Sequence, residues 1–565
     1  MAPKKLPVSD LTFREIIQQN CLYADKTKYI YRMINNYKNC FLARPRRFGK
    51  TLLIDTIEEL FTGNRELFKG LWIDTKQKYA FEKHPVLRFN MSYSKISTRE
   101  DFEGKLENDL REAAEIEKIS LSSNSYDDML GDLLKGIHKK HATGVVVLVD
   151  EYDDPISSFI TDRKLATDNL NILRGFFKTL KRQNAHIHFA FATGVTSFSL
   201  TAMGSGANNF KNISLKPKFA GICGFTISEF TKLFKNRFKG TRNRLKTIGD
   251  IGPDAGIDDL VTAIMDWYDG YNWQGPQHVL NPYSILNFFD DKELKAYWPQ
   301  SGQTSLLSSL VRERPLEFIQ PSLDGFFAKS LDTVELGRLD AIPVLYHNGY
   351  LTIDNRIRMA TPDAAKDGEA NHDVGYTFKT PNREIKLHYK SSLFQGAFDL
   401  LDEDFYNFAK DLKNALRNQD SQTLAEILRK LLSAISAFQH VPSEKHYHST
   451  IQAAFLAAGL EVFSEVPGAH GRPDMSIFLH NRVRMVLELK YCPAEVFGQN
   501  DESLSAKELA KALEEAEKAI REKDYTGLFR LTARNIMCIA LAVRGRNEVA
   551  ARIFELQSDD SHQST

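Results

Sequence analysis

Two patterns of hydrophobic residues divide the first 400 residues of the chain. From about residue 20 to residue 230, short apolar runs that suit strands alternate with segments whose apolar residues recur at helical spacing. Such alternation is typical of a parallel sheet whose strands are connected by helices. We therefore predict an α/β domain over residues 1–230, followed over 231–400 by a mostly helical, aromatic-rich middle or lid region.

The remainder of the chain returns to a mixed pattern. Leucines at helical spacing predict helices from about residue 401 to residue 440, among them Leu412, Leu416, Leu424 and Leu428. The sequence after them reads helix, strand, strand, helix, strand. We predict a second α/β domain over 401–557, including the preceding helices, and a disordered polar tail over 558–565.

Composition restricts the class of protein. The chain has 565 residues, of which 42% are hydrophobic and 26% charged, as in ordinary soluble proteins. Its net charge is +1, so a nucleic-acid partner would need a local basic surface. The five cysteines form no C-x-x-C pair, which favours a reducing compartment. No secretory signal and no apolar run of about 20 residues is visible, so we expect a cytoplasmic protein without membrane contact.

The first candidate site is a loop between a predicted strand, residues 40–43, and a predicted helix. Backbone N–H groups at a helix start bind phosphates, a lysine there reaches the β- and γ-phosphates, and a following threonine can ligate Mg²⁺. A full phosphate-loop motif has glycine where this chain has Arg44, so a basic turn that caps a helix would look similar. Five residues are candidates for nucleotide binding: Arg46, Arg47, Gly49, Lys50 and Thr51.

An apolar strand ending in two acids strengthens the nucleotide prediction. Residues 145–149 are all apolar and precede Asp150 and Glu151, as expected of a strand buried on both faces of a parallel sheet. In phosphate-loop ATPases an acid here holds Mg²⁺ through water, and the next one orients the attacking water. Acids are also common at strand ends for no catalytic reason. Thr193 ends a third strand and is a candidate γ-phosphate sensor, or a structural hydroxyl.

The second candidate site lies near the C-terminus. Residues 471–479 alternate as a strand does, with Asp474 on the polar face, and residues 485–490 place Glu488 and Lys490 side by side on one face. Adjacent antiparallel strands would bring Asp474 against Glu488. Two neighbouring carboxylates suit Mg²⁺ or Mn²⁺, and a nearby lysine can position water or stabilise a charged phosphate. A solvated, salt-bridged strand face is the alternative interpretation.

Other residues are weaker candidates. Glu444 lies on the predicted helix before the first of these strands, and Glu465 lies on or just before that strand. Either glutamate could complete the set of metal ligands. His446 and His448 at the same helix start are more typical of capping or surface positions. The basic segment 232–246 also contains Phe234 and Phe238, and suits phosphate contacts with some base stacking, or a solvated helix. Its candidate nucleic-acid contacts are Lys235, Arg237, Lys239, Arg242 and Arg244.

Taken together, these motifs resemble those of bacterial-type proteins that join an AAA-ATPase-like domain to a C-terminal PD-(D/E)XK nuclease domain. The matching segments are residues 41–51, 149–153, 193–195, 267–271, 281–284, 349–353, 381–384, 471–474 and 488–490. The resemblance implies that Arg44 is usual at its position, and that Asp474, Glu488 and Lys490 are the nuclease core. One departure is Ala519, where the family tends to have glutamine.

We therefore expect a multidomain α/β protein that binds ATP and Mg²⁺ or Mn²⁺. We expect it to cut nucleic acid, with DNA favoured over RNA as the substrate, and the bound nucleotide to control this activity. Defence or control of mobile elements would suit such a pairing, and assembly into a homo-oligomer is left open. The alternative is a nucleotide-dependent switch whose C-terminal fold binds nucleic acid or protein without cutting.

Overall fold

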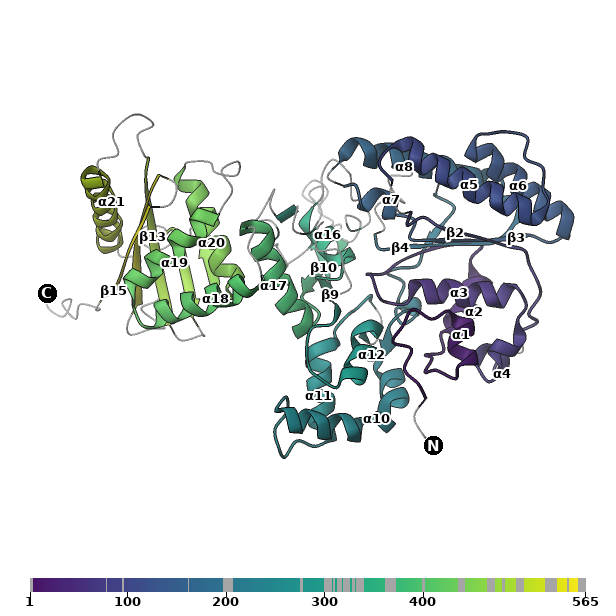
Figure 1. The fold of residues 1–565 in the computed structure, drawn as a ribbon, viewed down its shortest axis with the longest axis horizontal. Coiled ribbons are helices and arrows are strands. Elements are labelled where there is room, and N and C mark those ends of the chain that lie inside the picture. The colour runs from purple at the N-terminus through teal and green to yellow at the C-terminus, as the bar shows by residue number, and fades with distance from the viewer. Residues whose placement is uncertain are drawn as a thin grey trace. The chain divides into compact units, whose positions relative to one another are not determined.

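The chain forms two compact units, which are described separately (Figure 1): Met1–Gln303 with Ser322–Leu387, and Thr304–Pro321 with His388–Thr565. The expected tail, 558–565, lies outside the described residues. The computed structural model describes residues 4–77, 79–93, 96–160, 162–196, 207–274, 278–298, 340–360, 372–398, 402–434, 443–464, 473–479, 483–493, 502–523, 536–545 and 548–556, and seven residues between 307 and 331.

The first unit contains the predicted parallel sheet. Its strand order is β2-β3-β4-β1-β5, and every pairing is parallel. β3 lies between two strands and all six of its residues are buried, because helices cover both faces of the sheet (Figure 1). The strands are β1 Asn39–Ala43, β2 Val86–Asn90, β3 Val145–Asp150, β4 Ile187–Gly194 and β5 Lys211–Asn212.

The covering helices begin where the local sequence favours a helix start. Thr98, for example, caps α5 by accepting the backbone N–H of Asp101, whose carboxylate binds back to the cap. Helices α1 to α4 lie on one side of the sheet, and α5, α6 and α8 on the other (Figure 1). Their bounds are α1 Phe13–Gln18, α2 Thr27–Asn36, α3 Lys50–Phe61, α4 Trp72–Thr75, α5 Arg99–Glu117, α6 Tyr126–His141, α7 Asp154–Ser157 and α8 Arg163–Arg182.

The rest of the first unit is helical around a core of stacked phenylalanines, with ring centroids of Phe234 and Phe289 4.6 Å apart. A two-residue pairing of β6 and β7 closes this core, and a small antiparallel sheet, β8-β10-β9, accompanies the helices. The elements are β6 Phe225–Thr226, α10 Ile227–Ile248, α11 Ile257–Tyr268, β7 Val279–Leu280, α12 Pro282–Asp291, β8 Phe326–Phe327, α16 Ala341–His347, β9 Thr352–Ala360, β10 His372–Lys379 and α17 Arg383–Phe398.

The second unit has a five-stranded mixed sheet in sequence order, antiparallel except for the parallel pair β13 and β14. One face packs on α18, α19 and α20, and the other on α21. The elements are α18 Asp402–Arg417, α19 Ser421–Ala434, α20 Glu444–Ala457, β11 Glu461–Ser464, β12 Met475–Leu479, β13 Val483–Cys492, α21 Glu502–Glu522, β14 Ile536–Arg544 and β15 Glu548–Leu556.

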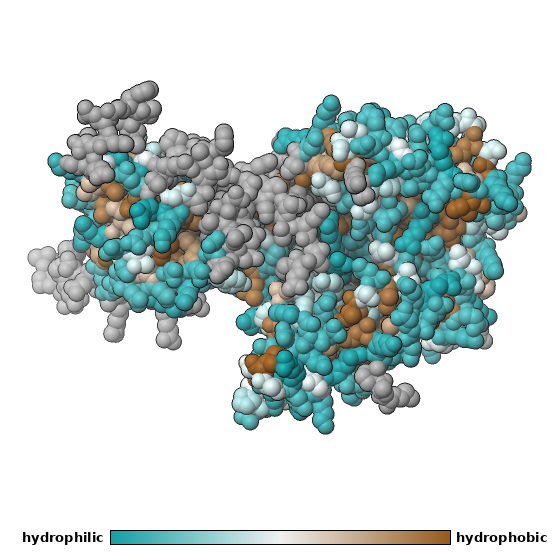
Figure 2. Space-filling model, viewed as in Figure 1, coloured by the Kyte–Doolittle hydropathy of each residue, from teal (hydrophilic) through white to brown (hydrophobic). Residues whose placement is uncertain are grey.

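The surface is mainly polar. Figure 2 shows hydrophilic residues over most of the visible face, with apolar residues in scattered groups. Among the described residues, no helix combines the length and the apolar character that crossing a membrane requires.

Two of the motifs found in the sequence pack directly against each other. The side-chain amide of Asn382 donates to the carbonyl oxygen of Asp269 at 2.9 Å. Next to this bond, Gly270 has φ +109°, and a Cβ atom there would lie 2.0 Å from the carbonyl oxygen of Pro381. Only glycine satisfies both the backbone conformation and this close approach.

We therefore expect Gly270→Ala to destabilise the first unit by more than about 2 kcal/mol, because positive φ and a backbone clash act together. The control is Gly240→Ala within α10, where a Cβ atom would meet nothing within 4 Å. This change should stabilise the unit by about 0.5–1 kcal/mol, since alanine favours helix. Thermal unfolding of both variants checks the pair, and equal midpoints would contradict the packing described.

Candidate nucleotide and metal sites

The predicted phosphate loop connects β1 to α3. Gly49 adopts φ +87° directly before the helix, a conformation that suits glycine. Lys50 is 5% exposed, and its amine donates to the carbonyl oxygen of Pro45 at 3.2 Å. Burial lowers the pKa of Lys50, while the carboxylates of Glu151, Asp153 and Asp150 act in the opposite direction. The end of β3 thus places a cluster of negative charge around the lysine of the loop.

Arg44, which replaces the expected glycine, is part of the protein interior. It is fully buried, and its guanidinium donates to the carbonyl oxygens of Ala43 at 2.8 Å and Ser214 at 2.9 Å. The guanidinium also lies 4.2 Å from the ring centroid of Trp273, a favourable cation–π contact. Burial lowers the pKa of Arg44 to about 10, so it stays charged at neutral pH. Arg44 therefore anchors the start of the loop.

Asp150 presents a buried oxygen that the protein does not satisfy. It is 1% exposed, and its Oδ1 accepts the backbone N–H of Glu151 at 3.0 Å. Its Oδ2 has no hydrogen-bond partner among the described residues. Burial raises the pKa of Asp150, and the Thr51 hydroxyl and Lys50 act against this rise. A hydrated Mg²⁺ beside Thr51 would satisfy this oxygen. Glu151 follows at φ +49°, a costly conformation for a residue other than glycine.

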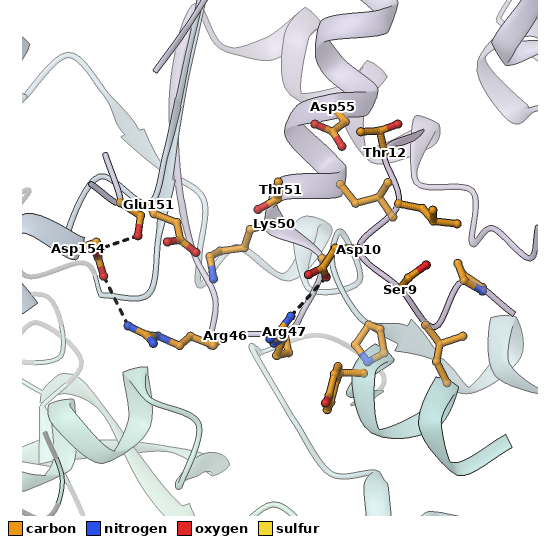
Figure 3. Close-up of a pocket in the computed structure, with 18 of the residues that line it drawn as sticks. Ser9, Asp10, Thr12, Arg46, Arg47, Lys50, Thr51, Asp55, Glu151 and Asp154 are labelled. Carbon is orange, nitrogen blue, oxygen red and sulfur yellow. Dashed lines mark hydrogen bonds and ion pairs between the residues drawn. The ribbon is translucent and has the colours of Figure 1, made fainter. Parts of the chain in front are cut away.

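Lys50, Thr51 and Glu151 border a cavity of about 920 Å³ in the first unit. In Figure 3 the amine of Lys50 lies beside the carboxylate of Glu151, and the two loop arginines lie close by. Arg46 pairs with Asp154 at 3.5 Å. The N-terminal segment and α12 also line the cavity, through Val8, Asp10, Leu11, Tyr283, Leu286 and Asn287, and further lining residues come from α3, from β2 and the segment after it, and from residues 151–159.

Arg47 is held on two sides. Its guanidinium pairs with Asp10 at 3.4 Å and lies 5.0 Å from the ring centroid of Tyr283. Both arginines predicted to bind nucleotide are thus engaged by groups that a phosphate would have to replace.

Thr193 lies apart from the cavity. Its side chain is fully buried, and its hydroxyl donates to the carbonyl oxygen of Leu42 on β1 at 3.0 Å. This contact is the one that the structural role predicts, and the sensor role stays a prediction. The sheet edge is instead fixed by Asp153, which accepts the backbone N–H groups of Val195 at 3.0 Å and Thr196 at 2.7 Å.

In the second unit the predicted antiparallel pairing of β12 and β13 is confirmed. Met475 pairs with Leu487, which brings Asp474 to Glu488, and Asp474 Oδ2 accepts the backbone N–H of Leu489 at 2.7 Å. Glu488 is only 2% exposed. Its Oε1 lies 3.3 Å from the amine of Lys490.

The second oxygen of Glu488, Oε2, is buried and has no hydrogen-bond partner among the described residues. Burial raises the pKa of Glu488, and the charge of Asp474 raises it further, against the effect of Lys490. Burial likewise raises the pKa of Asp474. The pKa of Lys490 is raised in turn, because the neighbouring carboxylates outweigh its own burial. Two such carboxylates fit a divalent cation between them.

The weaker metal candidates differ in position. Glu444 begins α20 beside the pair, with Oε1 3.9 Å from the amine of Lys490. His448 contacts the carbonyl oxygen of Asp474 at 2.9 Å, so it supports the strand start. Glu465 lies outside the described residues. In the described ranges no group of three His, Cys, Asp or Glu side chains is arranged to hold a metal ion.

The basic segment forms the exposed face of α10, but it offers no rings for stacking. Phe234 and Phe238 are buried in the phenylalanine core, so the expected stacking with bases is wrong for these two residues. Arg237 donates to the carbonyl oxygen of Lys4. Lys235, Lys239 and Arg244 are exposed, and Arg242 is partly exposed. These described side chains could contact phosphates, so this part of the prediction stays a prediction.

Comparison with known proteins agrees with both domains. Residues 7–203 match the family model described as predicted AAA-ATPase, and residues 442–552 match the PD-(D/E)XK nuclease superfamily. Over 517 residues the chain is 30% identical to an uncharacterized protein in the vnfD 5′ region of Azotobacter chroococcum mcd 1, an alignment that covers 90% of this chain and 93% of the relative. The chain belongs to the family of AAA-ATPase-like proteins with a PD-(D/E)XK nuclease-superfamily domain.

One residue near the nuclease-superfamily site of this AAA-ATPase-like protein was not found from the sequence. Lys523 follows α21, and its amine lies 3.8 Å from Glu488 Oε1. Two lysines from different elements thus face one carboxylate oxygen. The signal that could have pointed to Lys523 is its place four residues after Ala519, about one helical turn along the helix that follows β13.

We expect Glu488→Gln to stabilise the metal-free protein by on the order of 1 kcal/mol, because a buried charge that the two lysines compensate only in part is removed. The folded-state pKa of Glu488 lies above the ordinary 4.5. The wild type therefore loses stability relative to Glu488→Gln as the pH rises above 4.5 and the buried carboxyl group ionises. Mn²⁺ should raise the unfolding midpoint of the wild type but not of this variant.

The control is Glu508→Gln, which removes the charge from a carboxylate that pairs with Arg544 at 2.7 Å. It should gain no stability and keep the Mn²⁺ effect. A Glu488→Gln protein that is less stable than the wild type, or still stabilised by Mn²⁺, would contradict this description of the site.

Proposed function

We propose that this protein is a metal-dependent nuclease whose activity is controlled by ATP bound to the AAA-ATPase-like domain. The observation that carries the nuclease part is the buried Oε2 of Glu488, which has no hydrogen-bond partner in the part of the chain that the structure describes and lies beside Asp474 and Lys490. A carboxylate pair of this kind is stable as two anions only with a cation, and the adjoining lysine supplies the positive charge that phosphodiester cleavage needs.

Each residue of the nuclease site then has a defined task. Asp474 and Glu488 hold Mg²⁺ or Mn²⁺, with Glu444 placed to orient Lys490. When bound, the metal supplies a Lewis acid and lowers the pKa of coordinated water. Lys490 positions the attacking water or stabilises charge on the phosphate, and Lys523 limits the freedom of the Glu488 carboxylate. Of the predicted metal candidates, Glu465 keeps its status as a prediction.

The nucleotide cavity suggests which end holds which part of ATP. Lys50, Thr51, Asp150 and Glu151 form the polar end, and they suit the phosphates and Mg²⁺. Leucine, valine and tyrosine side chains of the N-terminal segment and α12 form the apolar end, and they suit the base. Binding of the phosphates would draw Arg46 and Arg47 from their present acidic partners.

We further propose the division into an ATPase-like part, 1–230, a middle part, 231–400, and a nuclease part, 401–557. DNA is the proposed substrate, and the exposed basic residues of α10 are its proposed contacts outside the nuclease site. A nuclease under nucleotide control would suit defence against foreign DNA or control of mobile elements.

The test uses the purified full chain with labelled single- and double-stranded DNA and RNA, in Mg²⁺ or Mn²⁺, with and without ATP. Asp474→Asn and Lys490→Ala should each reduce cleavage by about 100-fold or more, since they remove metal and charge stabilisation of the transition state. Lys50→Ala should abolish the effect of ATP. Lys518→Ala, an exposed lysine of α21 with 70% side-chain exposure, is the matched control and should cut normally.

Cleavage that persists in Asp474→Asn and Lys490→Ala would contradict the assigned site. A wild type that binds nucleic acid in a nucleotide-dependent way but cuts none of the substrates would instead identify a non-cutting switch. ATP that changes neither binding nor cleavage would refute the regulatory part.

A further inference from the structure

A buried glutamate in the first unit belongs to neither site. Glu384 lies in the first turn of α17 and is fully buried. Among the described residues no lysine or arginine pairs with it. It accepts three hydrogen bonds instead: from the Ser284 hydroxyl at 2.8 Å, and from the backbone N–H groups of Tyr297 at 2.6 Å and Trp298 at 2.8 Å. A buried carboxylate without a cation is costly, so its three donors must keep their positions.

The donors of these bonds lie on, or are bonded to, segments that line the nucleotide cavity. Ser284 is in the first turn of α12, next to Tyr283, which lines the cavity and underlies the guanidinium of Arg47. Trp298 donates its indole N–H to the carbonyl oxygen of Arg46, within the phosphate loop, at 3.4 Å. One carboxylate therefore connects both arginine-bearing positions of the loop with the start of α17.

The same neighbourhood is tightly packed, which limits independent movement of its parts. Asn382, two residues before Glu384, binds the carbonyl oxygen of Asp269. Gly349 lies so close to Pro45 and Trp298 that a Cβ atom there would approach Pro45 to 3.0 Å. A shift of the loop backbone must move Trp298, and a shift of Trp298 must move or break its bond with Glu384.

Helix α17 is the continuous element that leaves this neighbourhood. It runs from Arg383 to Phe398, and the boundary between the two units falls within it, after Leu387. A rotation or fraying of its first turn therefore changes the helix that enters the nuclease-bearing unit.

We propose, on the basis of the ATP-binding role proposed above, that Glu384 is a positioning residue that transmits occupancy of the nucleotide cavity to α17. Phosphates that recruit Arg46 and Arg47 displace the loop carbonyl bound by Trp298 and the ring of Tyr283. Because Glu384 is bonded to Trp298 and Ser284, both displacements move its carboxylate, and this movement rotates or frays the first turn of α17.

Hydrogen exchange of the full chain, measured with and without a non-hydrolysable ATP analogue and Mg²⁺, tests this role. In the wild type the analogue should change exchange at α3 and, by about threefold or more, at α17. Glu384→Ala should keep the response of α3, which reports binding, and lose that of α17. Glu384→Gln, which keeps acceptor and shape, should restore the α17 response. Lys386→Ala, an exposed position of the same helix, is the matched control and should respond as the wild type does.

Trp298→Phe gives a second test if Glu384→Ala does not fold. It removes the indole donor while keeping an aromatic ring, and it should weaken the α17 response while α3 still reports binding. The inference is overturned if α17 of the wild type does not respond while α3 does, or if Glu384→Ala or Trp298→Phe transmits the change as the wild type does. Exchange does not depend on cleavage, so loss of the nuclease assignment alone would leave this result unchanged.

Discussion

Both candidate sites depend on one physical constraint: a carboxylate oxygen is buried at a strand with no hydrogen-bond partner among the described residues. In the first unit it is Oδ2 of Asp150 at the end of β3, and in the second it is Oε2 of Glu488 within β13. An ionised oxygen in such a place is costly unless a cation or a strong donor reaches it. Within the described residues no hydrogen-bond donor reaches either oxygen. The nearby lysines, Lys50 and Lys490, provide part of the compensating charge and leave the rest for a divalent ion.

The phosphate loop reaches its conformation by an unusual route. Where a glycine would normally allow close packing, Arg44 is buried and bonded to main-chain carbonyls, and it packs against Trp273. Two tryptophans that follow the parallel sheet in the sequence therefore contact the loop directly: Trp273 packs on Arg44, and Trp298 donates to the carbonyl oxygen of Arg46. The loop is therefore part of a packed assembly that extends from β1 to α17, which makes its conformation sensitive to residues remote in sequence.

Much of this was predictable because it depends on local pattern. The all-apolar run before Asp150 predicted a strand buried on both faces, and the alternation around Asp474 and Glu488 predicted the antiparallel pair β12 and β13. The unpredicted parts depend on contacts between distant residues. Edge strands β11 and β15 are only half-buried and carry weak patterns. Glu384 and Trp298 are 86 residues apart, and Lys523 meets Glu488 only through the fold of α21.

The most direct test of the central claim is anomalous scattering at the manganese edge. Crystals would be grown with Mn²⁺ and a non-hydrolysable ATP analogue. We predict two manganese peaks per chain, one between Asp474 and Glu488 and one beside Asp150 and Thr51. Crystals that contain the analogue but show manganese at neither carboxylate would contradict the account, because the buried oxygens would then be satisfied in some other way.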